Sequence, residues 1–395
     1  MNIASDSEDS IPIGRRVTGV ATLALGHAVN DSYAYVLQAV LPAVIPTLGL
    51  TLGMAGGLVS LYQVTSSLIQ PAVGYLADRS ALRWPAWVGI ALSSVAAGLL
   101  GLAPNYLALL GLLIAGGIGT AIFHPVSAAM AGAAAPAHAR GRWLGLYVTA
   151  GSFGLAFGPW GIGVLAADGD VTRIWPIMLP GLAIAGIVAL LAPRSRKPTQ
   201  RNASLSETVR RYGRVLSALV LVSVLRALSG AAIVTFIPLL ATQRGANLEQ
   251  ATVPLTAYLL AGAVGGLVGG YVSDRAGRDR TIVISLLLSV PFGVYAALVP
   301  TVGWDFVAAA AVSGLLLNGS FVVTTVRGQE SVPGSVGMVT GLLLGVSIGL
   351  GGVAVTPIAL LAETIGLPGA AAVAACMAAL AAWAMVLVPR NEVVH

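Results

Sequence analysis

The sequence is poor in charge and in cysteine. Only 9% of its 395 residues are Asp, Glu, Lys or Arg, whereas an ordinary soluble domain has about 25%. The chain has one lysine, Lys197, and one cysteine, Cys376. An intrachain disulfide and a multi-thiolate metal site are therefore impossible. Together these shortages exclude a soluble globule, a disordered chain and a disulfide-stabilised scaffold.

Long apolar runs occupy most of the chain, which is 57% hydrophobic with a mean hydropathy of +0.89. A helix needs about 20 apolar residues to cross a bilayer. The runs are continuous rather than alternating in polarity, which favours membrane helices. We expect twelve spans, at 17–48, 53–77, 84–103, 106–134, 141–166, 174–192, 214–242, 250–273, 280–300, 304–327, 336–362 and 367–388.

The basic residues predict the orientation of these spans. Of the 21 Lys and Arg residues, all but Arg173, Arg226 and Arg244 fall on the termini and the even-numbered connections. Positive connections stay in the cytoplasm, so both termini are expected there. The predicted organisation is a tail at 1–16, a six-helix bundle at 17–192, a basic linker at 193–213, a second bundle at 214–388 and a tail at 389–395.

The two predicted bundles share a sequence pattern. Gly74, Asp78 and Arg79 recur 196 residues later as Gly270, Asp274 and Arg275, and Pro42 recurs as Pro238 at the same offset. Phe123 and Pro159 match Phe321 and Pro357 at an offset of 198. A nearly constant shift predicts two pseudo-symmetric six-helix halves, an architecture of secondary transporters whose substrate site lies between the halves at the membrane midplane.

Several motifs make the chain similar to a known family. The segments 74–79 and 270–278, together with Gly154-Leu-Ala-Phe-Gly158-Pro159, resemble signatures of the major facilitator superfamily. His27-Ala-Val-Asn30-Asp31, the run from Gln63 to Pro71, and Phe123-His124-Pro125 resemble its fosmidomycin-resistance-like branch. The resemblance implies the all-α twelve-helix fold, a bacterial-type inner membrane, and proton-driven export of a small compound.

The duplicated loops are candidates for gating. A loop carboxylate can meet a helix N-terminus or a basic partner in only one orientation of the two halves. The alternative is that these acids merely cap loops at the membrane surface. The candidate gating residues are Gly74, Asp78, Arg79, Gly270, Asp274, Arg275 and Arg278. Hinge motion is expected around Gly158, Pro159 and Pro357, in spans otherwise rich in packing glycines.

Four ionisable residues lie deep within the spans: His27, Asp31, His124 and Arg226. An aspartate or arginine at a helix centre costs about 2.5–3.5 kcal/mol, so such residues normally serve a function. Asp31 and His124 are the candidates for proton coupling. An ion pair between Asp31 and Arg226 across the halves is an alternative, and His124 could instead satisfy the carbonyl group freed by Pro125.

The candidate substrate site surrounds these groups. His27, Asp31 and Tyr35 are spaced four residues apart and share one helix face, with Asn30 on its flank. The guanidinium of Arg226 suits a phosphonate, phosphate or carboxylate, so a small anionic substrate is expected. Gln63 and Gln70 share a face and serve either the substrate or a helix contact. The expected substrate-binding set is His27, Asn30, Tyr35, Gln63, Gln70, Arg226 and Asn318.

The sequence favours a monomeric, proton-coupled antiporter that exports a small anionic or amphiphilic drug or metabolite. Proton-coupled or facilitated uptake of a nutrient is an alternative. A metal-ion carrier using His27, Asp31 and His124 is a weaker one, and it predicts metal-dependent stabilisation that His124→Ala abolishes. No Walker loop is present, which excludes ATP drive. We expect no enzyme activity, no cofactor, no bound metal and no nucleic-acid partner.

Overall fold

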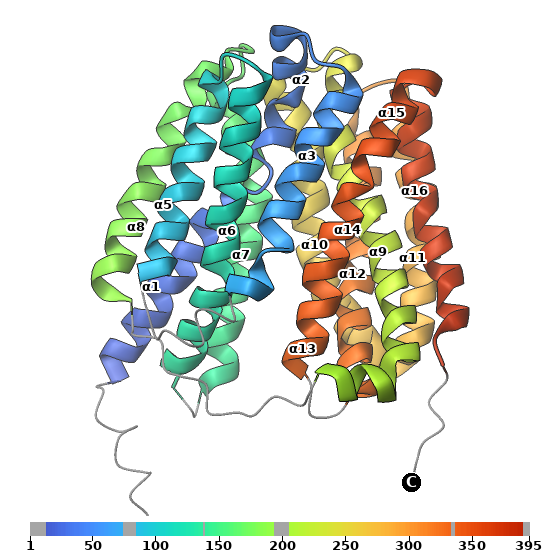
Figure 1. Ribbon diagram of the computed structural model, residues 1–395. Helices are drawn as coiled ribbons and strands as arrows, with labels where there is room; N and C mark the ends of the chain where they lie inside the picture. The colour runs from blue at the N-terminus through green and yellow to red at the C-terminus, as the bar shows by residue number, and fades with distance from the viewer. Residues whose placement is uncertain (1–12, 74–83, 137–138, 193–204, 333–335, 390–395) are drawn as a thin grey trace, which may run out of the picture.

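The structure is a computed structural model (Figure 1) that describes residues 13–73, 84–136, 139–192, 205–332 and 336–389. Within these ranges the regular elements are all helical. The first half contains α1 (Ile13–Ser32), α2 (Val36–Leu48), α3 (Leu52–Ser67), α5 (Trp84–Leu99), η1 (Leu100–Leu102), α6 (Tyr106–Ala134), α7 (Arg140–Leu165), η3 (Val171–Ile177) and α8 (Met178–Leu191). The second half contains α9 (Leu205–Gln243), α10 (Leu248–Ala276), α11 (Arg278–Leu298), α12 (Trp304–Ser331), α13 (Val336–Gly341), the π-helical η4 (Leu342–Val346), α14 (Ser347–Val353), α15 (Val355–Ile365), α16 (Leu367–Ala384) and η5 (Met385–Leu387).

The prediction of an all-α integral membrane protein is confirmed. In the described ranges, ten helices are long and apolar enough to cross a membrane. The other two expected spans are α1–α2, which is interrupted, and Ala86–Leu102, which is shorter. The described part of the chain is thus consistent with twelve spans. Helix α9 begins at Leu205, inside the expected linker 193–213, and runs on as the seventh span without interruption.

The first span is broken at the level of its acid. Helix α1 ends at Ser32, and Tyr33, Ala34 and Tyr35 form turns before α2 begins. Isolated backbone hydrogen bonds of turns span this gap; for example, Ala34 N donates to the Asp31 carbonyl oxygen at 3.1 Å. Discontinuous helices of this kind form binding sites in many membrane transporters, because unwound backbone exposes polar groups inside the membrane.

The prolines expected to act as hinges have different surroundings. Helix α7 runs unbroken through the buried Pro159, and its Gly158 packs so closely on α1 that a Cβ there would collide with the Ser32 carbonyl group. The eleventh span instead breaks at Ala354, between α14 and α15, three residues before Pro357. Proline has no N–H and leaves the carbonyl group four residues earlier without a helical donor. In the eleventh span that group belongs to Val353.

The two halves meet closely at the end of the bundle opposite the termini (Figure 1), which we call the far end. Gly53 N at the start of α3 donates to Glu363 Oε1 of α15 at 2.7 Å. Two turns further along, Ser60 Oγ lies 2.8 Å from the Gly352 carbonyl oxygen and 3.1 Å from that of Val353. The seam between α3 and α14–α15 is therefore hydrogen-bonded from the far end inward.

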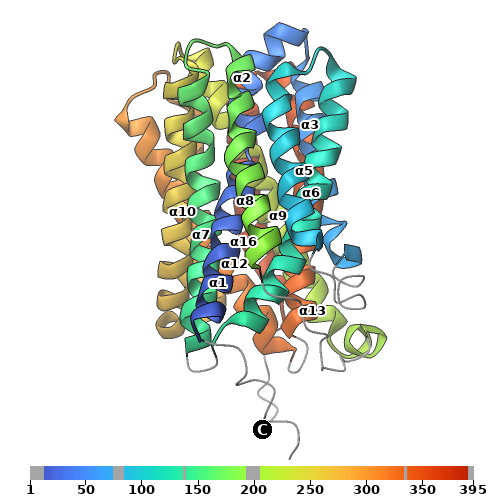
Figure 2. The ribbon, with the colours of Figure 1, turned by 90° about the vertical axis from the view of Figure 1, so that its left-hand side faces the viewer.

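At the terminal end, where α1 begins and η5 ends, three glycines have open space around them. A Cβ added to Gly141 or Gly145 of α7, or to Gly341 of α13, would meet no other atom within 4 Å. At the far end of the same helix α7, Gly163 has no such room because Thr252 of α10 lies against it. Figure 2 shows α7 and α10 side by side along this second seam.

Candidate transport site

Three titratable side chains meet inside the first half. His27 Nε2 lies 3.2 Å from Asp31 Oδ2, and His124 Nε2 lies 3.1 Å from Asp31 Oδ1. His27 and Asp31 come from successive turns of α1, whereas His124 comes from α6. We call this group the triad. Its carboxylate therefore bridges two helices, with one oxygen for each ring.

Backbone carbonyl groups orient both rings. His27 Nδ1 lies 2.9 Å from the Tyr147 carbonyl oxygen, and His124 Nδ1 lies 3.1 Å from that of Thr120. A carbonyl oxygen only accepts hydrogen bonds, so each Nδ1 must carry a hydrogen. Each Nε2 is thereby the free position of its ring, and both Nε2 atoms face the carboxyl group of Asp31.

The three side chains differ in exposure and in packing. The side chain of His124 is 28% exposed, compared with 14% for Asp31 and 11% for His27. The ring of His27 stacks on Tyr147 at a centroid distance of 4.3 Å, and the Tyr147 hydroxyl lies 2.7 Å from Ser127 Oγ. His27 is thus built into the protein core, while His124 is the more accessible ring.

Among the described residues, the triad is also the group whose geometry could hold a metal ion. Its three ligand atoms lie within 4.8 Å of one another, and metal-bound histidines commonly donate their other ring nitrogen to a carbonyl group. However, both N–O distances in the triad, 3.1 and 3.2 Å, lie within the range of direct N–H···O hydrogen bonds. Protons between these atoms account for the arrangement without a cation.

Arg226 of α9 is the buried cation of the second half. It is 6% exposed, its guanidinium carbon lies 4.3 Å above the Phe321 ring, and its Nε has no hydrogen-bond partner. Among the described residues, no carboxylate lies within ion-pair distance of it. Asp31 pairs with the two histidines instead, so the expected alternative of a direct Asp31–Arg226 ion pair is not formed here.

The remaining candidate substrate residues have varied surroundings. Asn30 Nδ2 donates to Asp31 Oδ1 at 3.3 Å, and Tyr35 lies where Asp31 and Arg226 both act on it electrostatically. Gln70 Nε2 donates to the Ser66 carbonyl group at the end of α3, and Asn318 Nδ2 donates to the Gly314 carbonyl group of its own helix. Gln63 packs against Gly352 at the seam. Tyr35 and Asn30 thus adjoin the charged groups, whereas Gln63 lies between the halves.

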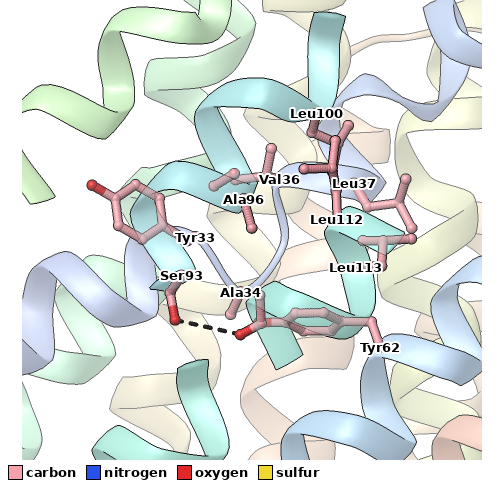
Figure 3. Close-up of a pocket in the computed structure, with 12 residues that line it drawn as sticks. Tyr33, Ala34, Val36, Leu37, Tyr62, Ser93, Ala96, Leu100, Leu112 and Leu113 are labelled. Atoms are coloured by element: carbon pink, nitrogen blue, oxygen red, sulfur yellow. Dashed lines mark hydrogen bonds between the residues drawn. The ribbon is translucent and has the colours of Figure 1, made fainter. Parts of the chain in front are cut away.

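A small cavity of about 20 Å³ lies beside the break in the first span (Figure 3). Tyr33 and Ala34 of the break line it, together with Tyr62, Ser93 and several leucines. This volume accommodates one water molecule. The Tyr62 hydroxyl lies 3.4 Å from Thr120 Oγ1, on the residue whose carbonyl oxygen orients His124. Polar groups therefore continue from the triad to the break.

The second copy of the loop signature is bonded within its own half. Arg278 donates to Asp274 Oδ1, and its Nη2 lies 2.9 Å from Glu330 Oε1 of α12. Arg275 lies over the ring of Tyr271, and Gly270 has open space around it. Gly74, Asp78 and Arg79 of the first copy lie outside the described residues. In this arrangement Asp274 contacts its own half rather than the seam.

Sequence reasoning missed Tyr147, Glu363 and Ser60. Tyr147 was hidden because its orienting group is a backbone carbonyl, which carries no residue-specific signal. Glu363 lies one residue beyond the expected eleventh span, 336–362, and is the one acid of the observed span Met338–Ile365. A lone acid near the end of a span is a usable signal. Ser60 has no comparable signal, because its role depends on the carbonyl group that Pro357 frees in the other half.

The chain was compared with known proteins. A sequence model of the Major Facilitator Superfamily matches residues 23–252 and 219–395. The fosmidomycin resistance protein of Escherichia coli (strain K12) is 27% identical over 355 residues, covering 87% of this chain and 86% of the relative. An uncharacterised MFS-type transporter of Bacillus subtilis (strain 168) is 30% identical over 365 residues, with the same coverage.

The fold is also similar to solved transporter structures. One is a bacterial homologue of the human lysosomal transporter Spinster, with a TM-score of 0.73 and 16% identity. That similarity covers 93% of this chain and 96% of the homologue. The family match spans almost the whole chain and agrees with the duplicated halves and the helical bundle. The chain therefore belongs to the Major Facilitator Superfamily, and it is a multi-pass membrane transporter rather than an enzyme.

Proposed function

We propose that this transporter is a monomeric, proton-coupled antiporter that exports a small anionic or amphiphilic compound by alternating access. The observation that carries the proposal is the triad, in which both histidines present Nε2 to one carboxyl group. The name of the E. coli relative, fosmidomycin resistance protein, supports efflux and supplies fosmidomycin as a first substrate to test. The proposed setting is a bacterial-type inner membrane with both termini in the cytoplasm.

Proton counting explains how the triad can couple. Because each Nδ1 already carries a hydrogen, each Nε2–oxygen contact needs one more proton. Two protons satisfy both contacts, either on the two rings or with one on Asp31 and one on a ring, and the net charge is +1 in both cases. Removing one proton leaves a nitrogen lone pair facing a carboxylate oxygen, so one ring must turn away. Proton loss thus has a structural consequence.

Substrate and proton are exchanged because the substrate competes with a histidine for the Asp31 carboxylate. A substrate N–H or O–H that binds one carboxylate oxygen leaves the adjoining ring without its acceptor, and that ring then releases a proton. His124 is the ring we assign to this release, because it is the more exposed one. Arg226, buried without a carboxylate partner in the described part of the chain, holds the anionic group of the same substrate.

The gating and hinge residues are assigned to the opening and closing of the seam between the halves. With the far end hydrogen-bonded, exchange of access requires the α3–α15 contacts to break and the terminal end to close. We assign the closing contacts to the loop signatures, namely Gly74, Asp78, Arg79, Gly270, Asp274, Arg275 and Arg278. We assign bending to the eleventh span near Pro357, and sliding of α7 against α1 to the region of Gly158 and Pro159. Tyr35, Gln63, Gln70 and Asn318 complete the substrate contacts.

One observation favours a second candidate, coupled uptake. The triad at a charge of +1 and Arg226 together form a positive region, which attracts an anion. The bound anion would in turn favour the protonated form of the nearby histidines, so that anion and proton bind together. Co-binding gives symport, whereas competition at Asp31 gives antiport. The sign of the proton change on substrate binding separates the two: release supports antiport, and uptake supports symport.

The test uses purified protein in proteoliposomes with an imposed pH gradient. Fosmidomycin and a panel of small phosphonates, phosphates and carboxylates are the substrates, and a pH-sensitive dye reports protons. Asp31→Asn should abolish uphill transport while substrate exchange without a gradient continues. Asp170→Asn, in the exposed loop before η3, is the matched control and should transport normally. Uphill transport by Asp31→Asn would refute the proposal.

A further inference from the structure

A groove opens on the second half at the terminal end, away from the triad. Its volume is about 1120 Å³, and it lies between α9, α11 and the α16–η5 segment, which pack together at the right of Figure 1. This exceeds the range of about 300–1,000 Å³ that is usual for small-molecule sites. Its walls are mainly apolar, and several of these side chains are open to the surroundings. Leu221 is 40% exposed, Ile284 44% and Val386 79%.

Two arginines form the polar rim of the groove. Arg214 lies near the start of the apolar part of α9, and Arg280 is the third residue of α11. Both are exposed, and no ion pair joins either of them to another described residue. The acid on the rim, Asp279, is already neutralised, because its Oδ1 accepts from Arg327 Nε at 2.8 Å. The rim is therefore positive.

The start of α11 adds to this charge. Its cap residue, Gly277, offers no side-chain acceptor, so the first amide groups of the helix point outward unbonded by a cap. A helix N-terminus carries a partial positive charge and attracts anions. Arg280 and Asp279 of this first turn both line the groove. The cationic rim thus combines two side chains with a helix end.

The depth of the groove matches a lipid. Four residues separate Arg280 from Ile284 and seven separate Arg214 from Leu221, so the apolar walls lie about 6–10 Å from the rim at 1.5 Å per residue. A soluble anion would contact the arginines of the rim but not the apolar walls. A neutral lipid would contact the walls but would not pair with the arginines. Basic pockets between membrane helices on the cytoplasmic side bind anionic lipid headgroups.

We propose that the groove between α9, α11 and η5 binds one anionic phospholipid, with its phosphate at Arg214 and Arg280 and an acyl chain along Leu221, Ile284 and Val386. The site is separate from the proposed transport site. It adjoins the second loop signature, since Arg278 and Asp279 are neighbours in the chain. Lipid bound there is in position to bias the movement of α11.

The test is native mass spectrometry of the full-length protein titrated with phosphatidylglycerol or phosphatidylcholine of identical chains. Each arginine near an anionic group contributes about a fivefold preference. The wild type should therefore bind one phosphatidylglycerol about 30-fold more tightly than phosphatidylcholine, and Arg214→Gln with Arg280→Gln should remove this preference. Arg140→Gln with Arg142→Gln, at the start of α7, is the matched control and should keep it.

Two further arms make the test decisive. Leu221→Trp fills the groove without changing charge and should weaken the binding of both lipids. Inorganic phosphate at millimolar concentration should not displace phosphatidylglycerol, because phosphate makes no apolar contacts. Equal lipid preference in wild type and the double variant, or displacement by phosphate alone, would overturn the proposal. Transport is not part of these readouts, so they are independent of the proposed function.

Discussion

The two halves carry different chemistry at equivalent positions. Arg226 stands 196 residues after Asn30, the offset that also relates Pro42 to Pro238. Asn30 adjoins a triad of mutually bonded, titratable groups, whereas Arg226 is a single permanent charge on an aromatic ring. In the proposed function, the first half exchanges protons through the triad and the second half holds the charge of the substrate through Arg226.

The aromatic residues of the two sites show the same divergence. Phe123 lies beside the rings of His27 and His124 in the first half, and its equivalent Phe321 lies beneath Arg226 in the second. A phenyl face favours a cation. The same residue thus packs against imidazole rings in one half and contacts a guanidinium in the other.

The largest effect is expected from removing the fixed charge. Arg226→Met should weaken binding of an anionic substrate about 30-fold or more, since losing one partner of a buried charged contact costs about 2–5 kcal/mol. It should also leave the melting temperature unchanged or raise it, because the side chain is buried without a carboxylate partner in the described part of the chain. Ligand titration and thermal unfolding measure the two effects.

Arg244 provides the matched control in the same half. Its guanidinium donates to the carbonyl oxygens of Ala296 and Ala297 and also lies over an aromatic ring, that of Phe306. Arg244→Met should lower the melting temperature and leave substrate binding intact. If Arg226→Met were instead the destabilising variant of the two, Arg226 would be a structural residue and the contrast between the halves would disappear.

Within the first half, His124 and His27 can be compared in the same way, one as the proposed proton donor and the other as a packed residue. His124→Gln should reduce transport driven by a pH gradient by about tenfold, within the 5–150-fold range of typical coupling between sites. His27→Gln should instead lower the free energy of unfolding by about 1 kcal/mol, because the stack on Tyr147 is lost. Gradient-driven flux and chemical denaturation are the measurements. Normal gradient-driven transport by His124→Gln would assign the released proton to another group.

The part of the site that periodicity could predict lies on one helix. A period of 3.6 residues places His27 and Asp31 on one face, and span boundaries place His124 and Arg226 at a similar depth. The expectation that Tyr35 shares this helix face is wrong, because α1 ends at Ser32 and Tyr35 lies in the break. Which of His124 and Arg226 would meet Asp31 depended on helix packing across the bundle. The close approach of α7 to α1 positions the Tyr147 carbonyl group. Gly154 and Gly158 permit this approach, but small residues do not specify which helix they pack against.

The fold was more predictable than the seam. Apolar runs of bilayer length and a constant repeat offset identify spans and halves, because both are properties of long segments. The contacts at the far end depend on single atoms. Pro159 and Pro357 are equivalent in the repeat, yet α7 stays continuous while the eleventh span breaks before Pro357. Tertiary packing decides between these outcomes.

The smallest effect is expected at the seam between α3 and α14–α15, where the hydroxyl group of Ser60 contacts the second half. Ser60→Ala removes the contacts of Ser60 Oγ with Thr356 Oγ1, at 2.7 Å, and with the Gly352 and Val353 carbonyl groups. One such hydrogen bond is worth about 0.5–1.5 kcal/mol net, so the variant should shift the equilibrium toward far-end opening by about 2- to 10-fold. Spin-label distances between α3 and α15 measure this population. Ser66→Ala is the matched control, because Ser66 Oγ donates to the Gln63 carbonyl group of its own helix. If both variants moved the distances equally, the effect would belong to helix α3 itself. A shift in Ser60→Ala alone would instead make the contact of Ser60 with the broken stretch of the eleventh span a working part of the far-end closure.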